Sequence, residues 1–229
     1  MAIPTSVATG SGSGSVSTTG VLSDITVAVG DVVVLRVSET DGNGRSVTPS
    51  DSLGHTWTLR QTALNSRKVF IYTTTVTTAG TMTITTAWNL AATWLSFANA
   101  IRDSDGAAAF DAGDQFTQTA TSCFAAPSTA IDTAANVIVL AVYAINPART
   151  WTVGIGYASD SSGAGYLFQS RSSALALVDE RAPATHNSSP LASAAAVISI
   201  KGSSGSIKYT QLERSIRGLN RGLAPGLAH

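Results

Sequence analysis

Two continuous apolar runs constrain the fold of this chain more than any other feature. Residues 32–37 read Val-Val-Val-Leu-Arg-Val, and residues 136–145 read Asn-Val-Ile-Val-Leu-Ala-Val-Tyr-Ala-Ile. Each run is rich in β-branched residues and is too short to cross a bilayer as a helix. A short run that is apolar at nearly every position is typical of a central strand buried on both faces. We therefore expect one such strand in each half of the chain.

Shorter segments around both runs have the alternating pattern of half-buried strands. Those of the first half are residues 24–29, 56–64, 68–76, 81–86 and 93–101, and those of the second half are residues 151–155, 166–170, 174–179 and 194–201. The segments on either side of Asn65-Ser66 are expected to pair. Because both halves follow a similar order, the pattern indicates either a weak internal duplication or two halves of one sandwich.

The composition supports an all-β protein. Hydrophobic residues make up 44% of the chain and charged residues only 12%, while Ser and Thr each occur 29 times. Thr is β-branched and suits a half-exposed strand face, and helix-period segments are nearly absent before residue 207. We predict an antiparallel, jelly-roll-like β-sandwich over residues 21–201. The Ser/Thr/Gly-rich residues 1–20 are predicted to be an extended N-terminal arm or lead-in.

The last 28 residues differ in composition from the rest. Residues 202–206 read Gly-Ser-Ser-Gly-Ser and are typical of a flexible link, and residues 207–217 could form one short helix. A segment this short and glycine-interrupted cannot bury its own leucines. We predict that residues 202–229 are a link and an arm that docks on another subunit, through Leu212, Arg214, Ile216, Arg217, Leu219, Arg221, Leu223 and Leu227. A disordered tail and a strap over its own domain remain alternatives.

Charge and cysteine content exclude several classes of function. The formal net charge is zero and the isoelectric point is about 6.8, so no field attracts nucleic acid to the whole body. The single cysteine, Cys123, cannot form an internal disulfide and is expected to be a small buried apolar residue. The N-terminus lacks the basic and apolar regions of a signal peptide, so assembly in a host cytoplasm is expected, with no membrane partner.

Catalytic and metal-binding patterns are missing from the sequence. His55 lies in the segment Asp51-Ser52-Leu53-Gly54-His55-Thr56-Trp57, where Asp51 and His55 could be read as a catalytic or metal pair. No nucleophile motif accompanies them, and we favour a turn in which Asp51 accepts hydrogen bonds from its own backbone. No His or Cys cluster has metal-ligand spacing. The chain is therefore predicted not to be an enzyme and to need no metal or cofactor.

Two features could still bind a ligand. The four tryptophans could stack on sugars, although packing inside a sandwich is the favoured interpretation. Trp88, next to Asn89 in a segment expected to be a loop, is the best candidate for exposure. Asp103 and Asp105 open the densest acidic cluster, which resembles the start of a calcium loop but lacks its closing Glu. Trp88, Asp103 and Asp105 are thus the candidate ligand-binding residues.

Four stretches resemble a known class of domain. They are Gly30-Asp31 with the start of the first apolar run, the turn that leads to Trp57, the segment Ala79-Gly80-Thr81-Met82-Thr83-Ile84-Thr85, and the closing strand Ala196-Val197-Ile198-Ser199-Ile200-Lys201. Over residues 20–201 the chain resembles β-sandwich domains of tailed-phage virion proteins and bacterial surface proteins, with His55 in place of the commoner Asn. The resemblance implies a structural virion protein, either a capsid decoration or a minor tail or fibre subunit. Its partners would be other virion subunits, including copies of itself.

Two other functions remain alternatives to the virion role. One is a module at a phage tail tip that binds a carbohydrate or host receptor, with a host surface glycan as its partner. The other is a hydrolase on a sandwich scaffold, which the missing nucleophile motif disfavours. Arms that order only on assembly would favour the structural role, whereas an exposed patch of Trp88 and the Asp103 loop would favour glycan binding.

Overall fold

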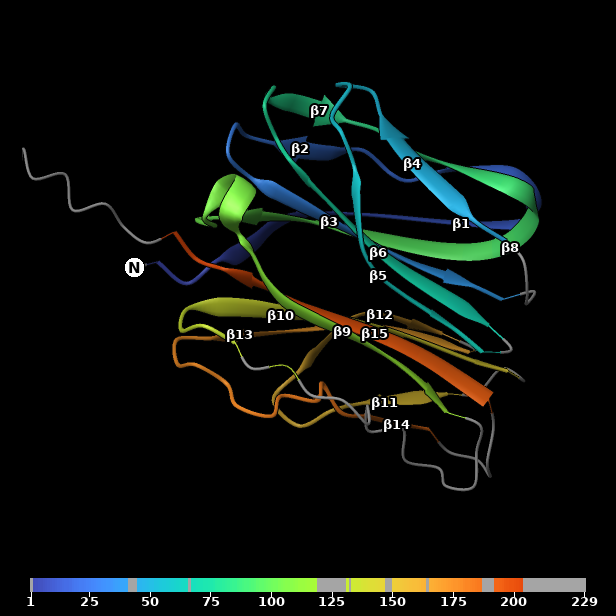
Figure 1. The fold of residues 1–229 in the computed structure, drawn as a ribbon. Coiled ribbons are helices and arrows are strands. Elements are labelled where there is room, and N and C mark those ends of the chain that lie inside the picture. The colour runs from blue at the N-terminus through green and yellow to red at the C-terminus, as the bar shows by residue number, and fades with distance from the viewer. Residues whose placement is uncertain are drawn as a thin grey trace, which may run out of the picture.

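The computed structural model describes residues 2–40, 45–65, 67–118, 131, 133–146, 150–163, 165–186 and 192–203, and strands dominate it (Figure 1). The first half contains β1 (Thr5–Val21), β2 (Ile25–Val27), β3 (Val32–Glu39), β4 (Val47–Asp51), β5 (Thr58–Leu64), β6 (Lys68–Thr75), β7 (Gly80–Met82) and β8 (Ile84–Arg102). A 3-10 turn, η1 (Gly106–Ala108), leads to β9 (Phe110–Gln118), β10 (Val137–Asn146), β11 (Trp151–Val153), β12 (Ala158–Gly163), β13 (Tyr166–Ser173), β14 (Ala184–His186) and β15 (Ala192–Lys201). The predicted all-β fold is confirmed. Within these ranges no helix is long and apolar enough to cross a membrane.

Each half of the chain builds one antiparallel sheet. The first sheet has the order β1-β8-β3-β6-β5, with β4 also paired to β8, and the second has the order β12-β13-β10-β15-β9. The two sheets stack as the layers of a sandwich (Figure 1). Short outer pairs lie beyond them, β2 with β7 in the first half and β11 with β14 in the second. The predicted antiparallel sandwich is therefore confirmed, and its two layers are the two halves of the sequence.

Strand pairing in the first half is nested. β1 pairs with β8, β2 with β7 and β3 with β6, so the first strand meets the last and the inner strands follow in turn. This winding takes place within one half, whereas the sequence had suggested one jelly-roll-like sandwich for residues 21–201. The jelly-roll description stays a prediction.

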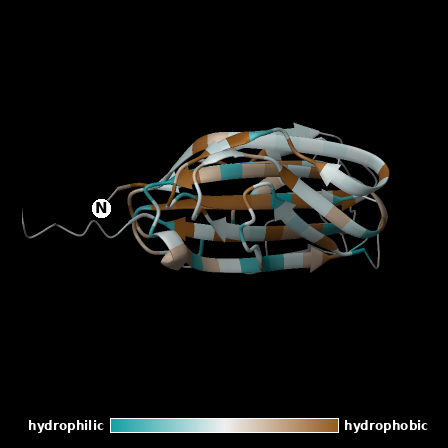
Figure 2. Ribbon diagram, turned by 90° about the horizontal axis from the view of Figure 1, so that it is seen from above, coloured by the Kyte–Doolittle hydropathy of each residue, from teal (hydrophilic) through white to brown (hydrophobic). Residues whose placement is uncertain are grey.

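The central strands β3 and β10 are buried on both faces, as predicted. Alternate residues of these strands, such as Val34 and Leu140, meet between the sheets, and those in between, such as Leu35 and Tyr143, face the outer strand pairs. The described residues therefore form three apolar clusters, one between the sheets and one under each outer layer. Figure 2 shows apolar residues concentrated along the inner strands. Each fully buried Val, Leu or Ile contributes about 1.5–3 kcal/mol, so the two strands contribute much of the stability.

The two halves repeat one backbone plan. Gly30 precedes β3 with φ 90° and Asn136 precedes β10 with φ 56°, a region that Gly and Asn adopt most readily. The backbone N–H of each donates to a carbonyl after the neighbouring strand, that of Val76 or of Ala174. The main strands correspond as β1 to β9, β3 to β10, β5 to β12, β6 to β13 and β8 to β15. The similar order seen in the sequence thus reflects a repeated topology as well as two layers of one sandwich.

The N-terminal segment is extended, as predicted, but the prediction of an arm separate from the body is wrong. β1 is an edge strand of the first sheet, paired with β8 along most of its length. A Cβ at Gly14 would lie 2.5 Å from Trp94 Nε1, and one at Gly20 would lie 2.2 Å from Trp94 Cζ2. The glycines therefore let the strand pack closely on the ring of Trp94, which explains a composition that resembles a linker.

The predicted hairpin around Asn65 is confirmed, because β5 and β6 pair on either side of it. The predicted docking arm and Cys123 lie outside the described residues. The prediction that residues 204–229 bind a neighbour is therefore taken up as a proposal below.

Candidate functional site

Trp88, predicted to be exposed, is buried, and this corrects the ligand-binding prediction. Its side chain is only 5% exposed, because β8 continues through this segment and β4 pairs beside it, with Val47 opposite Trp88. The Trp88 ring packs edge-on against Phe70 at a centroid distance of 6.2 Å. Trp94 and Trp151 are buried as well. Trp57 is partly buried against the first apolar cluster, so all four tryptophans pack on the core, as the favoured interpretation held.

The Asp103–Asp105 loop holds the end of β15. The backbone N–H of Asp105 donates to the carbonyl of Lys201, and that of Ser203 donates to the carbonyl of Asp103 at 2.7 Å. The Asp105 carboxylate lies 3.8 Å from Lys201 Nζ. Trp88 lies in the part of β8 that pairs with β4, whereas Asp103 follows the other end of that strand. The structure thus does not bring Trp88 together with Asp103 and Asp105 in an exposed patch.

Asp51 and His55 lie in a turn in which their polar side-chain atoms are hydrogen-bonded, which is the interpretation favoured from the sequence. One Asp51 oxygen accepts from the backbone N–H of Leu53 and lies 3.0 Å from His55 Nδ1, and the other accepts from Trp57 Nε1 at 2.8 Å. His55 Nε2 accepts from the backbone N–H of Thr78 at 3.3 Å. Both ring nitrogens of His55 therefore have partners within the fold.

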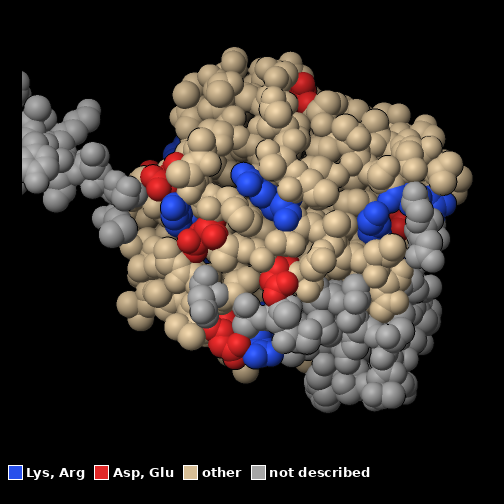
Figure 3. Space-filling view, in the orientation of Figure 1, with Lys and Arg blue, Asp and Glu red and all other residues tan. Residues whose placement is uncertain are grey.

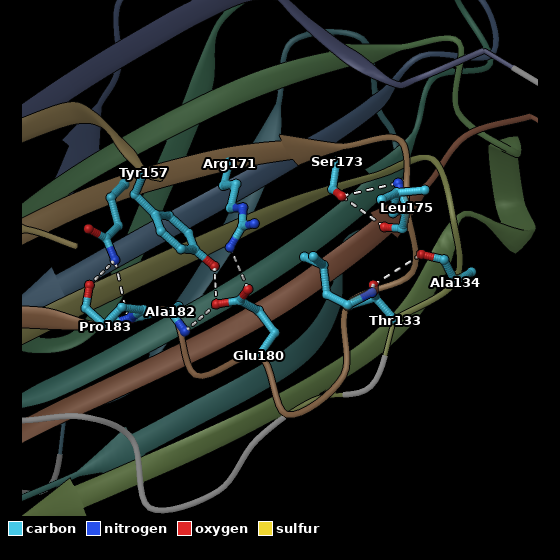
Figure 4. Close-up of polar contacts among 11 residues, drawn as sticks. Thr133, Ala134, Tyr157, Arg171, Ser173, Leu175, Glu180, Ala182 and Pro183 are labelled. Atoms are coloured by element: carbon cyan, nitrogen blue, oxygen red, sulfur yellow. Dashed lines mark hydrogen bonds and ion pairs between the residues drawn. The ribbon is translucent and has the colours of Figure 1, made fainter. Parts of the chain in front are cut away.

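Glu180 is the centre of a second buried cluster, in the outer layer of the second half (Figure 4). One oxygen accepts from the Tyr157 hydroxyl and from the backbone N–H of Ala182, both at 2.9 Å, and the other accepts from Arg171 Nη1 at 2.8 Å. Burial, and next the charge of Glu180, raises the pKa of Tyr157. Asp179 and Ala182 flank this carboxylate with positive φ, so the network holds a strained turn in place.

A third charged group joins the two sheets. Arg36 of β3 is fully buried between Phe97 and Phe168, and burial lowers its pKa. Its guanidinium donates to the carbonyls of Ala141 and Gln169 and to the carboxylate of Asp160 at 2.6 Å. Asp160 also accepts from the Ser170 hydroxyl at 2.7 Å. These contacts are internal to the fold, and like the two previous clusters they indicate a structural role.

A pocket lined mainly by threonines lies at the β5 edge of the sandwich. It has a volume of about 380 Å³ and lies among the start of β5, the end of β6 and η1. Six threonines line it with Arg60 and His55, namely Thr56, Thr58, Thr73, Thr74, Thr75 and Thr77. Such a volume lies at the lower end of the range for small-molecule sites.

A β-bulge places Arg60 in this pocket. In the pairing with β6, Leu59 lies opposite Tyr72 and Gln61 opposite Ile71, which leaves Arg60 as the extra residue. Arg60 Nε donates to Thr73 Oγ1 at 2.8 Å, and the guanidinium lies 4.6 Å from the centroid of the Phe110 ring. Burial lowers the pKa of Arg60. In the described part of the chain no carboxylate pairs with this guanidinium.

A second pocket, of about 300 Å³, lies at the opposite edge of the sandwich, between β1–β8 and β12–β13. Serines dominate its lining, namely Ser11, Ser13, Ser96 and Ser161, with Tyr166 and Phe168 beside them. None of the described residues that line it is charged. Of these two pockets, only the one with Arg60 offers a charge to a ligand.

The described residues contain no group of three His, Cys, Asp or Glu side chains that could hold a metal ion. No protein-family model, curated protein or solved structure matches the chain. The candidate site therefore depends on the geometry of this molecule alone. Arg60 was missed in the sequence, where the only available signal was a charged residue inside a strand segment.

Proposed function

We propose that this chain is a structural subunit of a tailed-phage particle, a capsid decoration or a minor tail or fibre subunit, and not an enzyme. The resemblance of residues 20–201 to virion domains motivates the particle. The three buried charge clusters support the structural role, because their donors and acceptors face each other and not a substrate. Figure 3 shows that charged side chains are sparse on one face of the molecule, a surface that suits a protein kept in an assembly.

One observation carries the proposal: residues 22–200 supply three apolar clusters of their own, one between the sheets and one under each outer layer. A body with these cores does not need the leucines of residues 204–229 in order to fold. We propose that Leu212, Ile216, Leu219, Leu223 and Leu227 are buried on a neighbouring copy of the chain. Each leucine fully buried in this way contributes about 1.5–3 kcal/mol.

Charge is distributed in favour of such docking. Residues 204–229 carry four basic side chains and one acidic one, so the preceding 203 residues hold ten basic and thirteen acidic side chains. A segment with net charge +3 thus follows a body with net charge −3. In the proposed contact, Arg214, Arg217 and Arg221 pair with carboxylates of the neighbour, which would fix the orientation of the arm.

The Asp103–Asp105 loop has a role in this proposal. It binds the backbone of Lys201 and Ser203, so the last described residues are attached to the end of the body. A docking arm that starts from a fixed point loses less conformational entropy on binding than one that starts from a mobile link.

The experiment removes residues 207–229 and measures both folding and assembly. We expect an unchanged far-UV circular dichroism spectrum and melting curve, because residues 22–200 supply cores of their own. Sedimentation of the full chain should show an oligomer, and the truncated chain should sediment as a monomer and lose occupancy on particles. Truncated protein that assembles or occupies particles like the full chain would refute the docking proposal.

A charge-reversal variant separates the charge of the arm from its leucines. Arg214→Glu, Arg217→Glu and Arg221→Glu together should weaken assembly and abolish its dependence on salt. Arg181→Glu is the matched control, because Arg181 lies on the surface of the body and pairs with Asp179. A loss of assembly in the control alone would place the interface on the body and not on the arm.

A further inference from the structure

We propose that the Arg60 pocket binds the carboxylate of an acidic sugar residue, such as a uronic or sialic acid of a glycan. This inference is independent of the docking arm. It rests on the internal repeat of the fold, on an arginine with no counter-ion among the described residues, and on unused threonine hydroxyls in a pocket of sugar size.

Because the fold is repeated, Arg60 can be compared with the residue at the equivalent position of the second half. Asp160 is the bulge residue of β12, just as Arg60 is the bulge residue of β5. The side chain of Asp160 bonds to the hydroxyl of Ser170, and that of Arg60 bonds to the hydroxyl of Thr73. In each half, the hydroxyl residue lies opposite the residue two positions before the bulge. The two positions are therefore equivalent, and they carry opposite charges.

The charge is neutralised internally at only one of these two positions, as far as the described residues go. Asp160 pairs with Arg36, which stands six residues after Gly30 in the facing sheet. The residue six positions after Asn136, in the corresponding place of the second half, is the apolar Val142. The facing sheet therefore offers Arg60 no counter-ion at this place.

Most of the other arginines in the described ranges differ from Arg60. Five arginines of the described ranges pair with carboxylates, namely Arg36, Arg45, Arg102, Arg171 and Arg181. Arg60 instead bonds to Thr73 through Nε and lies over the Phe110 ring, which fixes the plane of the guanidinium. Its two terminal nitrogens form no ion pair with any described residue. A planar, oriented guanidinium is suited to bidentate binding of a carboxylate.

Threonine hydroxyls identify the rest of the ligand. In the described part of the chain, the hydroxyls of Thr58, Thr75 and Thr77 make no hydrogen bond within the protein. Neutral hydroxyls at the rim of a charged site match the hydroxyls of a sugar, because each can both donate and accept. A simple inorganic anion would use Arg60 and leave these hydroxyls to water.

The experiment titrates the full chain with three probes and follows the Arg60 Nε–H resonance and the threonine amides by NMR. The probes are glucuronic acid, glucose as the neutral sugar, and inorganic sulfate as the simple anion. We expect glucuronic acid to shift the resonances of Arg60, Thr58 and Thr75, and to bind more tightly than sulfate. Glucose should cause no saturable shift.

Variants test whether Arg60 carries the binding. Arg60→Gln should weaken glucuronic acid binding about tenfold or more, which is the loss expected for a charge-assisted hydrogen-bonded pair. Thr75→Val should weaken glucuronic acid binding and leave sulfate binding unchanged. Arg181→Gln is the control and should bind all probes like the unchanged chain. Melting curves of each variant show whether it is folded.

Three results would overturn the proposal. Glucuronic acid that causes no saturable shift would exclude the site, and equal binding of sulfate and glucuronic acid would reduce it to a simple anion site. Binding that is unchanged in a folded Arg60→Gln variant would place the ligand elsewhere. Because none of these measurements involves assembly, the docking proposal stands or fails separately.

Discussion

At equivalent positions, the outer layers of the two halves carry side chains of opposite character, apolar in the first half and charged in the second. Ile25 pairs with Met82 in the first half, and Ile131 pairs with Glu180 at the corresponding place in the second. Met82 is fully buried among apolar residues, whereas Glu180 binds Tyr157 and Arg171. The repeated backbone therefore fixes where a side chain must lie, and its neighbours decide whether that side chain is apolar or charged.

A second pair of residues shows the same divergence. Trp57 and Tyr157 each immediately precede the edge strand of their half, β5 or β12, and each donates to a buried carboxylate. The acceptor is Asp51 at the end of β4 in one half and Glu180 before β14 in the other. The need to bind a carboxylate is thus shared, but different segments supply the carboxylate.

The largest expected effect comes from giving the first half the side chain of the second. Met82→Glu places a carboxylate in an apolar cluster that contains neither an arginine nor a tyrosine at the right place. We expect a loss of about 4 kcal/mol or more in the free energy of unfolding, because an uncompensated buried charge is costly. Urea denaturation measures the loss. If Met82→Glu is nearly as stable as Met82→Gln at pH 7, this layer tolerates charge and the comparison fails.

The reverse exchange should cost less. Glu180→Met leaves Arg171 and the Tyr157 hydroxyl without their acceptor, and we expect a loss of about 3 kcal/mol in the free energy of unfolding. Arg171 is partly exposed and can turn to water, which limits the loss. The triple variant Glu180→Met, Arg171→Met and Tyr157→Phe removes the three polar side chains and leaves only the Ala182 backbone N–H without its acceptor. It should recover most of the lost stability, and a triple variant no better than the single one would show that the second half requires the charges.

The edge strand β1 offers a test of close packing in the first half. Gly20→Ala places a methyl group 2.2 Å from Trp94 Cζ2 and 2.5 Å from Thr86 Oγ1, so the indole must move. We expect a loss of about 2 kcal/mol from overpacking. Ser13→Ala, in the same strand but away from the Trp94 ring, is the control and should change the melting temperature little. Equal melting temperatures for the two variants would restore the interpretation of residues 1–20 as an arm.

Particular residues show how far the sequence could predict this structure. The runs around Val34 and Leu140 indicated strands buried on both faces, because a run this short and this continuously apolar is typical of a strand with no exposed face. β1 was hidden because its composition is that of a linker, although glycine at every second position is also the period of a strand. Trp88 was misplaced because its neighbour Asn89 resembled a loop, while the pairing with β4 depends on residues far away in the sequence.

The candidate site was less predictable than the fold. Arg60 reaches its pocket through a bulge, and a bulge is defined by the register of two strands, which alternation alone does not give. Its lack of a counter-ion among the described residues became visible only through the equivalence with Asp160, which again required the pairing of both halves. The sequence could identify the charged residue but not the unpaired state on which the proposal depends.

The smallest effect is a difference in alkaline stability between the halves. Burial raises the pKa of Tyr157, so the folded chain keeps this proton where the unfolded chain, with a pKa of about 10, loses it. Its contribution is complete below about pH 10 and declines by about 1.4 kcal/mol per pH unit above it. Tyr157→Phe removes this titrating group. The free energy of unfolding of the variant should therefore fall less steeply between about pH 10 and 11.5, by about 1.4 kcal/mol per pH unit. Trp57→Phe, the corresponding change in the first half, removes no titrating group and should leave the slope unchanged. Equal slopes in both variants would mean that the carboxylate cluster of the second half does not link its stability to pH.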